Sequence, residues 1–172
     1  MAFTFIVEDG SVVTGANSYV SVEEADDYLV ANIHVSATWS ALSTDEKQYL
    51  LVWGTRYLDQ RAVWNGYKTD ETSPLRWPRT GVYDRDKVLI GINEIPQQLK
   101  EGVIEMARYL ISDDRSVERG QDGLESLKVD VIELVFDKDY RLAEVPNELQ
   151  YILQNLGYVR AGSSTFAKIK RA

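Results

Sequence analysis

Cysteine is absent from this chain, and histidine occurs once, as His34. The missing thiols exclude disulfides, thiolate metal sites and cysteine nucleophiles, and a single imidazole excludes any site that needs two. The sequence also lacks the phosphate-loop pattern GxxxxGKS or GxxxxGKT, a GxGxxG after a strand, the metalloprotease pattern HExxH and the nucleophile pattern GxSxG. These absences predict a protein that is not an enzyme and uses no cofactor.

Long hydrophobic runs are missing as well. No apolar stretch approaches the roughly 20 residues that a membrane-spanning helix needs. The start, MAFTFIVEDG, has no basic residue ahead of its apolar run, which Glu8 and Asp9 interrupt, so it does not read as a signal peptide. The sequence therefore predicts a protein that is made in the cytoplasm of its host cell and does not contact a membrane.

Basic residues are outnumbered by acidic ones, 19 to 27, and the net charge is -8. Nonspecific affinity for DNA comes from neutralising phosphates with lysine and arginine, so this balance argues against a general DNA-binding protein. The C-terminal segment 157–172 differs, because it contains no acidic side chain and four basic ones: Arg160, Lys168, Lys170 and Arg171.

Three interpretations of that basic segment stay open: a disordered end, a nucleic-acid arm, or a strap on a partner subunit. Its composition by itself favours disorder. In the strap interpretation, Phe166 and Ile169 would anchor the segment in an acidic, apolar groove of the partner.

Two serine-to-glutamate pairs at capping-box spacing predict helix starts, at Ser21 with Glu24 and at Ser43 with Glu46. We expect the first helix over residues 21–32. The second should be the longest, and its apolar, heavily aromatic stripe is expected at Leu50, Trp53, Tyr57 and Trp64, which keep a helical spacing, with Leu51 and Leu58 widening it.

Gly54 lies inside that long helix, where glycine costs about 1 kcal/mol relative to alanine. We therefore expect another backbone to pack closely against it.

The remaining elements complete a mainly α fold class. We expect a short strand at 3–7, a third helix from Ile95-Pro96, a strand near 127–131 that folds into a hairpin or arm, and a short helix from Pro146. The predicted architecture is a small helical bundle with a long irregular loop at 65–94, a short β-strand or hairpin arm and an extended C-terminal tail. Residues 1–112 would form the core, 113–156 the arm and short helix, and 157–172 the tail.

The stretch SPLRWPRTGVYDRD, residues 73–86, is the most unusual part of that loop. Arg76, Trp77 and Arg79 could form a stacking platform for single-stranded nucleic acid. The alternative that we favour makes Trp77 a hydrophobic plug, with the arginines paired to Asp84, Asp86 or helix acids, because stacking channels usually combine several exposed aromatics with a positive groove.

Three close acidic pairs could in principle hold Mg²⁺, as in a metal-dependent nuclease: Asp84 and Asp86, Asp113 and Asp114, Asp137 and Asp139. All fall in polar loops or turns, where aspartate is favoured by turn chemistry. We expect no metal site.

The chain resembles a family of tailed-bacteriophage head–tail adaptor proteins, also called head-completion or connector proteins and often labelled DnaT-like single-stranded-DNA-binding proteins. The resemblance covers residues 6–112, in the stretches GANSYVSVEEADDYL, WGTRYLDQRAVWNGYKT, LRWPRTGVYDRD and IPQQLKEGVIEMARYL. Its most specific elements are Asn17-Ser18-Tyr19, Tyr57-Leu58-Asp59 and the run from Trp77 to Gly81.

The resemblance implies a structural virion protein in the neck between head and tail. Such a protein forms a homo-oligomeric ring, twelvefold in expectation, under the portal protein, receives the tail or tail-completion proteins and touches passing double-stranded DNA. The residues expected at subunit or partner interfaces are Arg76, Trp77, Pro78, Arg79, Asp84, Asp86, Arg160, Phe166, Lys168, Ile169, Lys170 and Arg171. The alternative is a single-stranded-DNA-binding protein that acts in phage replication.

Overall fold

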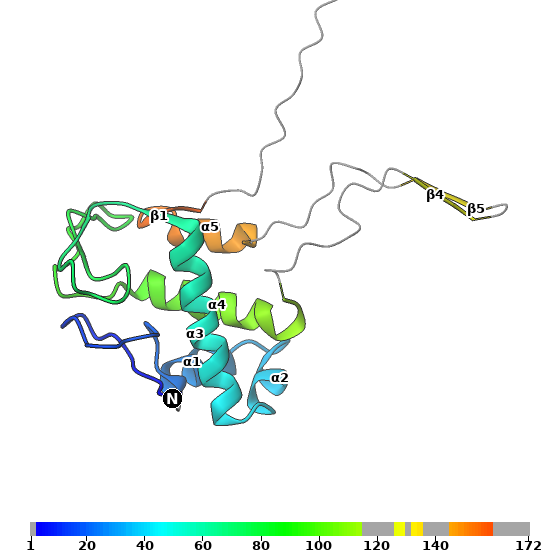
Figure 1. The fold of residues 1–172 in the computed structure, drawn as a ribbon, viewed down its shortest axis with the longest axis horizontal. Helices are drawn as coiled ribbons and strands as arrows, with labels where there is room; N and C mark the ends of the chain where they lie inside the picture. Colours follow the sequence, from blue (N-terminus) through cyan, green and yellow to red (C-terminus); the bar gives the residue numbers. More distant parts are fainter. Residues whose placement is uncertain (1–2, 115–125, 130–131, 136–144, 160–172) are drawn as a thin grey trace, which may run out of the picture.

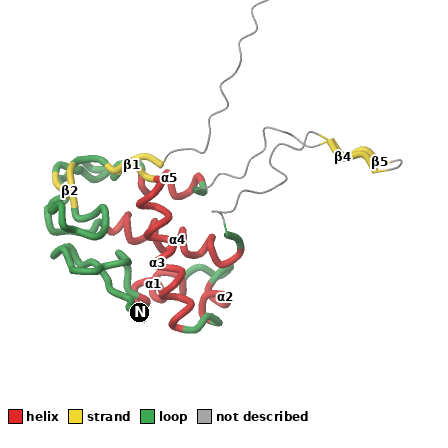
Figure 2. Tube along the Cα trace, in the orientation of Figure 1, coloured by secondary structure: helices red, strands yellow, loops and turns green. Residues whose placement is uncertain are grey.

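The computed structural model describes residues 3–114, 126–129, 132–135 and 145–159 (Figure 1). Within these residues the chain is mainly α, as the sequence predicts, with five helices and a few short antiparallel strand pairs (Figure 2). The helices are α1 (Val22–Val30), α2 (Ser36–Ser40), α3 (Thr44–Arg61), α4 (Gln97–Ser112) and α5 (Asn147–Leu153).

Both predicted capping boxes are confirmed. The Ser21 hydroxyl accepts from the backbone N–H of Glu24, and the Glu24 carboxylate accepts from the backbone N–H of Ser21. The same reciprocal pair joins Ser43 and Glu46 at the start of α3. Each pair satisfies two N–H groups that the first turn of a helix leaves without partners, so these two helix starts are encoded locally.

The core forms where α4 lies across α3 (Figure 1). A Cβ atom added at Gly54 of α3 would lie 3.0 Å from the carbonyl oxygen of Val103 and 3.3 Å from the backbone nitrogen of Ala107, both in α4. This confirms the predicted close approach of a second backbone. Buried side chains from both helices fill the contact, including Leu51, Leu58, Leu99, Val103 and Met106.

The strands are short and lie in pairs, one of which joins segments far apart in sequence. β1 (Ala62–Trp64) pairs with β6 (Gly157–Val159), and β2 (Tyr67–Lys68) pairs with β3 (Arg79–Thr80), both antiparallel. β4 (Ser126–Val129) and β5 (Ile132–Val135) form a separate hairpin. The first pair ties the end of α3 to the chain that follows α5, so the residues around Trp64 are held in place from both sides.

Two local expectations differ from the structure. Residues 3–7 form a single bridge, from Val7 to Ser18, in place of a strand, because the Asn17 side chain bonds the backbone of Ile6 and Thr4. The short helix α2 was not expected, and it brings Trp39 into the core with its indole N–H donated to Asp26 at 2.6 Å. Among the described residues, no helix has both the length and the apolar character to cross a membrane.

Candidate functional site

Trp77, the centre of the irregular loop, is fully buried. Its ring meets the ring of Trp64 edge to face, with the centroids 6.0 Å apart. An indole in this position fills the core and presents no face on which a base could stack. The hydrophobic plug favoured from sequence is therefore what the structure contains, and a stacking platform centred on Trp77 is not formed.

The loop is fixed to α3 through a buried cluster of Tyr19 and Asp59. The Tyr19 hydroxyl donates to the Asp59 carboxylate at 2.8 Å and accepts from the backbone N–H groups of Arg76 at 2.9 Å and Trp77 at 3.1 Å. Asp59 accepts in addition from the backbone N–H of Arg76 and from the indole of Trp64. These contacts bring together the three short sequence runs that carry the family resemblance most specifically, those around Tyr19, Asp59 and Trp77.

Burial dominates the protonation of this cluster. It raises the pKa of Asp59 to about 6, although the hydrogen bonds from Tyr19, Arg76 and Trp64 act in the opposite direction. Burial and the neighbouring Asp59 carboxylate together raise the pKa of Tyr19 well above its ordinary value. The phenol therefore stays protonated and remains a donor to Asp59.

The two arginines of the loop have different surroundings. The Arg79 guanidinium donates to three backbone carbonyls, those of Asn65 at 2.6 Å, Gly66 at 2.7 Å and Arg76 at 3.1 Å, and burial lowers its pKa. The expected pairing of Arg79 with Asp84, Asp86 or a helix acid is wrong, because the folded loop offers carbonyl oxygens at the guanidinium instead. Arg76 is exposed; its backbone N–H donates to Tyr19 and Asp59, and its positive charge favours the ionised form of Asp59 without forming an ion pair.

The outer side of α3 presents aromatic and basic side chains to solvent. Tyr49, Trp53, Arg56 and Gln60 follow one another at spacings of three or four residues and are all exposed. Trp53 is 37% exposed, and the Arg56 guanidinium lies 5.5 Å from the centroid of its ring. The assignment of Trp53 to the stripe was therefore wrong, whereas Tyr57, Leu51 and Leu58 of the same stripe are buried, together with Gly54 and Thr55.

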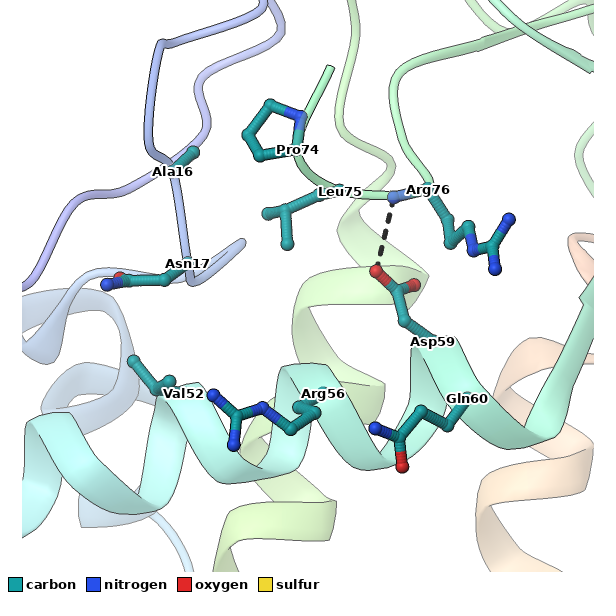
Figure 3. A pocket seen from close by; sticks show the side chains of 9 residues that line it. All are labelled: Ala16, Asn17, Val52, Arg56, Asp59, Gln60, Pro74, Leu75 and Arg76. Atoms are coloured by element: carbon teal, nitrogen blue, oxygen red, sulfur yellow. Dashed lines mark hydrogen bonds between the residues drawn. The ribbon is translucent and has the colours of Figure 1, made fainter. Parts of the chain in front are cut away.

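Phe3 extends this surface on the side of Tyr49, since the two rings meet edge to face with centroids 4.8 Å apart. A pocket extends it on the other side. Its lining includes Val52, Arg56, Asp59 and Gln60 of α3, Ala16 and Asn17, and the loop residues Pro74, Leu75 and Arg76 (Figure 3). We call the surface formed by Phe3, Tyr49, Trp53, Arg56, Gln60 and Arg76 the α3 face.

The guanidiniums of Arg56 and Arg76 make no ion pair with any described residue. Two exposed cations beside two exposed aromatic rings can bind an anion that carries flat apolar groups. Sequence reasoning missed this surface because it treated the aromatics of α3 as core. The signal that could have found it is the run Tyr49, Trp53, Arg56, Gln60, which keeps to one side of a helix.

The other predicted interface residues lie elsewhere. Pro78 is buried beside Trp77, and Asp84 accepts from the backbone N–H groups of Asp86 and Val88, a turn-stabilising role. Across the described residues, no group of three His, Cys, Asp or Glu side chains could hold a metal ion. The remaining predicted residues lie outside the described ones: Asp137, Asp139, Arg160, Phe166, Lys168, Ile169, Lys170 and Arg171.

No curated protein and no solved structure matches the chain significantly. One family model matches residues 3–172, almost the full length, and its description is "Putative DnaT-like ssDNA binding protein".

This match overturns the identification as a head–tail adaptor, and with it the virion, portal, tail and ring expectations, because the matched family is described by contact with DNA. The net charge of the chain led to the wrong expectation about DNA binding, because a summed charge does not show where the charges lie. The α3 face combines cations with exposed aromatic rings on an acidic protein. Since the match spans far more than half of its length, the chain belongs to the DnaT-like ssDNA-binding protein family.

Proposed function

We propose that this protein binds single-stranded DNA on the α3 face, with bases stacked on Trp53 and Tyr49 and phosphates paired with Arg56 and Arg76. The observation that supports this most strongly is that two exposed aromatic rings and two exposed guanidiniums share one surface. Any base can stack on an aromatic ring, while cations pair with the backbone, so such a surface binds with little sequence preference. The description of the family agrees with this class of ligand.

A single strand fits this surface better than a duplex. The rings of Tyr49 and Trp53 can contact only base faces that are not already stacked inside a duplex. A protein with this activity acts where strands are exposed, as in replication, and needs no catalytic residue for it.

The affinity is expected to be modest and sensitive to salt. The chain has a net charge of -8, and Asp45 and Glu46 lie at the start of α3, so the basic part of the face is limited to the second half of the helix and the loop. Each neutralised phosphate of a single strand contributes about 0.7 to the slope of log K against log salt, so two phosphates predict a slope of about −1.4.

The test is a fluorescence anisotropy titration of the full chain with a labelled oligo-dT of about 12 nucleotides, within the usual range of site sizes. Trp53→Ala should weaken binding by about 1–3 kcal/mol, or roughly 5- to 150-fold, because a stacked base loses its partner. Tyr158→Ala is the matched control, since this exposed tyrosine lies on β6 and not on the α3 face.

Unlabelled duplex should compete poorly with the oligo-dT, whereas an unlabelled single strand should displace it. Wild-type affinity in Trp53→Ala, or an equal loss in Tyr158→Ala, would locate DNA binding away from the α3 face.

A further inference from the structure

The pocket beside the α3 face differs in character from the face itself. It has a volume of about 310 Å³, at the lower end of the range for pockets that hold small molecules. Four of its side chains come from α3, and the opposite wall is the loop Pro74–Arg76 (Figure 3). The wall does not depend on a mobile lid, because Tyr19 and Asp59 bind the backbone N–H groups of Arg76 and Trp77.

The charges around the pocket are separated. In Figure 3 the guanidiniums of Arg56 and Arg76 point away from each other, with the Asp59 carboxylate between them. A phosphate in the middle of the pocket would face that carboxylate and be repelled, whereas a phosphate at either end would meet a guanidinium. The middle is therefore suited to a neutral group.

The middle of the pocket also has the surface that a base requires. Val52, Pro74 and Leu75 supply apolar contacts, and the Gln60 amide, which makes no hydrogen bond to a described residue, can both donate and accept. The Asp59 carboxylate is already occupied by Tyr19, Trp64 and the Arg76 backbone, so it shapes the site and does not compete for the ligand.

We propose that the pocket takes one base of the bound strand, turned out of its stack, while Arg56 and Arg76 bind the phosphates on its two sides. The ligand unit is a nucleoside with a phosphate on both its 3′ and 5′ oxygens. Turning out one base is easiest in a strand that is not paired, which agrees with a single-stranded ligand. This proposal rests on the proposed function and adds a fixed register, one nucleotide per protein, to a surface that would otherwise let the strand slide.

The experiment is isothermal titration of the full chain with four small ligands: thymidine 3′,5′-bisphosphate, thymidine 5′-monophosphate, thymidine and pyrophosphate. The bisphosphate should bind about tenfold more tightly than the monophosphate, because one further charged contact forms. Arg56→Gln and Arg76→Gln should each weaken the bisphosphate about tenfold and leave thymidine unchanged. Lys87→Gln is the matched control, since Lys87 is exposed and is not among the residues that line the pocket.

Pyrophosphate that binds as tightly as the bisphosphate would overturn the base pocket, since the site would then be a general anion patch. No saturable bisphosphate binding, together with oligo-dT binding that depends on Trp53, would also overturn the pocket and leave the proposed function standing. Bisphosphate binding without any oligo-dT binding would support the pocket and overturn the proposed function. If neither the bisphosphate nor oligo-dT binds, both the base pocket and the proposed function are overturned.

Discussion

Trp53 of α3 and Trp77 of the irregular loop differ in exposure, and neither follows the character of its neighbours along the chain. Trp53 keeps the helical spacing of a core residue in a helix rich in apolar side chains, yet it lies on the outer side of α3 beside Arg56. Trp77 lies in an irregular loop between arginines, yet it is fully buried against Trp64. The difference shows that neighbours along the chain do not decide exposure. Trp77 is held in the core because Tyr19 accepts from its backbone N–H and Asp59 accepts from that of Arg76, and both acceptors are distant in sequence.

The same division applies to the arginines next to Trp77. Arg79 closes the loop by bonding three carbonyls, and Arg76 points into solvent on the α3 face. One short loop thus contains a structural half, Trp77 and Arg79, and the residue Arg76, which we propose as its binding half.

The largest effect is expected for Trp77→Ala. Removing a fully buried indole leaves a cavity against Trp64 and should lower the free energy of unfolding by about 3–5 kcal/mol. Urea denaturation followed by circular dichroism measures this. Trp53→Ala is the comparison and should change the free energy of unfolding far less, so equal losses in the two variants would refute the contrast between the two tryptophans.

The next effect concerns pH and the Asp59 carboxyl that holds the loop. Its pKa is about 6 in the folded protein against an ordinary value of 3.8, so between these values the folded state binds more protons than the unfolded state. Stability contributed at this site therefore falls as pH rises from about 4 to above 6, by up to about 3 kcal/mol, and is level at higher pH.

The measurement is the free energy of unfolding across this range for wild type and Asp59→Asn, which has no carboxyl to titrate. Relative to the variant, the wild type should lose stability as pH increases. A difference that stays constant with pH, or that grows in favour of the wild type as pH rises, would show that burial does not control this carboxyl.

The two arginines of the loop are expected to affect different properties: Arg79 the stability of the fold, and Arg76 the affinity for DNA. Arg79→Gln removes charge-assisted hydrogen bonds to three backbone carbonyls, of which the bond to Gly66 is half-buried, and should cost about 1–3 kcal/mol of stability. Arg76→Gln should stay within about 0.5 kcal/mol of wild-type stability, as expected for an exposed side chain, and weaken oligo-dT binding about tenfold. Thermal melts and anisotropy on both variants check this, and Arg76→Gln with unchanged affinity would remove Arg76 from the binding half.

The smallest effect is expected for Phe3→Ala. The edge-to-face contact with Tyr49 restricts that ring, and such pairs contribute about 0.5–1.5 kcal/mol. Affinity for oligo-dT should fall by a few fold, and the double variant with Tyr49→Ala should bind no worse than Tyr49→Ala alone. Additive losses in this cycle would mean that Phe3 contacts DNA independently of Tyr49.

The parts of the fold that were predictable are those encoded locally. The starts of α1 and α3 follow from serine and glutamate three residues apart, and the close approach at Gly54 follows from a glycine inside a helix. The phase of α3 was not predictable from its own pattern, because aromatic residues occur on both its buried and its exposed sides. Gly54 indicated that a second backbone packs on α3, but not that this backbone is α4, whose contact leaves Trp53 on the outer side.

The candidate site was predicted only in part for the same reason. The sequence pointed to Arg76 as an interface residue, but the other residues of the candidate site come from α3. The loop that carries Arg76 is held in place by Tyr19. The three specific runs around Tyr19, Asp59 and Trp77 were visible in the sequence as separate features. Their convergence in one hydrogen-bonded cluster is a long-range contact, and no spacing along the chain encodes it.

We propose that DNA lies on Trp53 and not on Trp77. The most direct test is ultraviolet cross-linking of the full chain to oligo-dT, followed by mass spectrometry of the cross-linked peptides. The account predicts cross-links at Tyr49 or Trp53 of α3, lost in the presence of excess unlabelled single strand. Cross-links at Trp77 with none on α3 would contradict it, because a buried ring would then have to open to reach the strand.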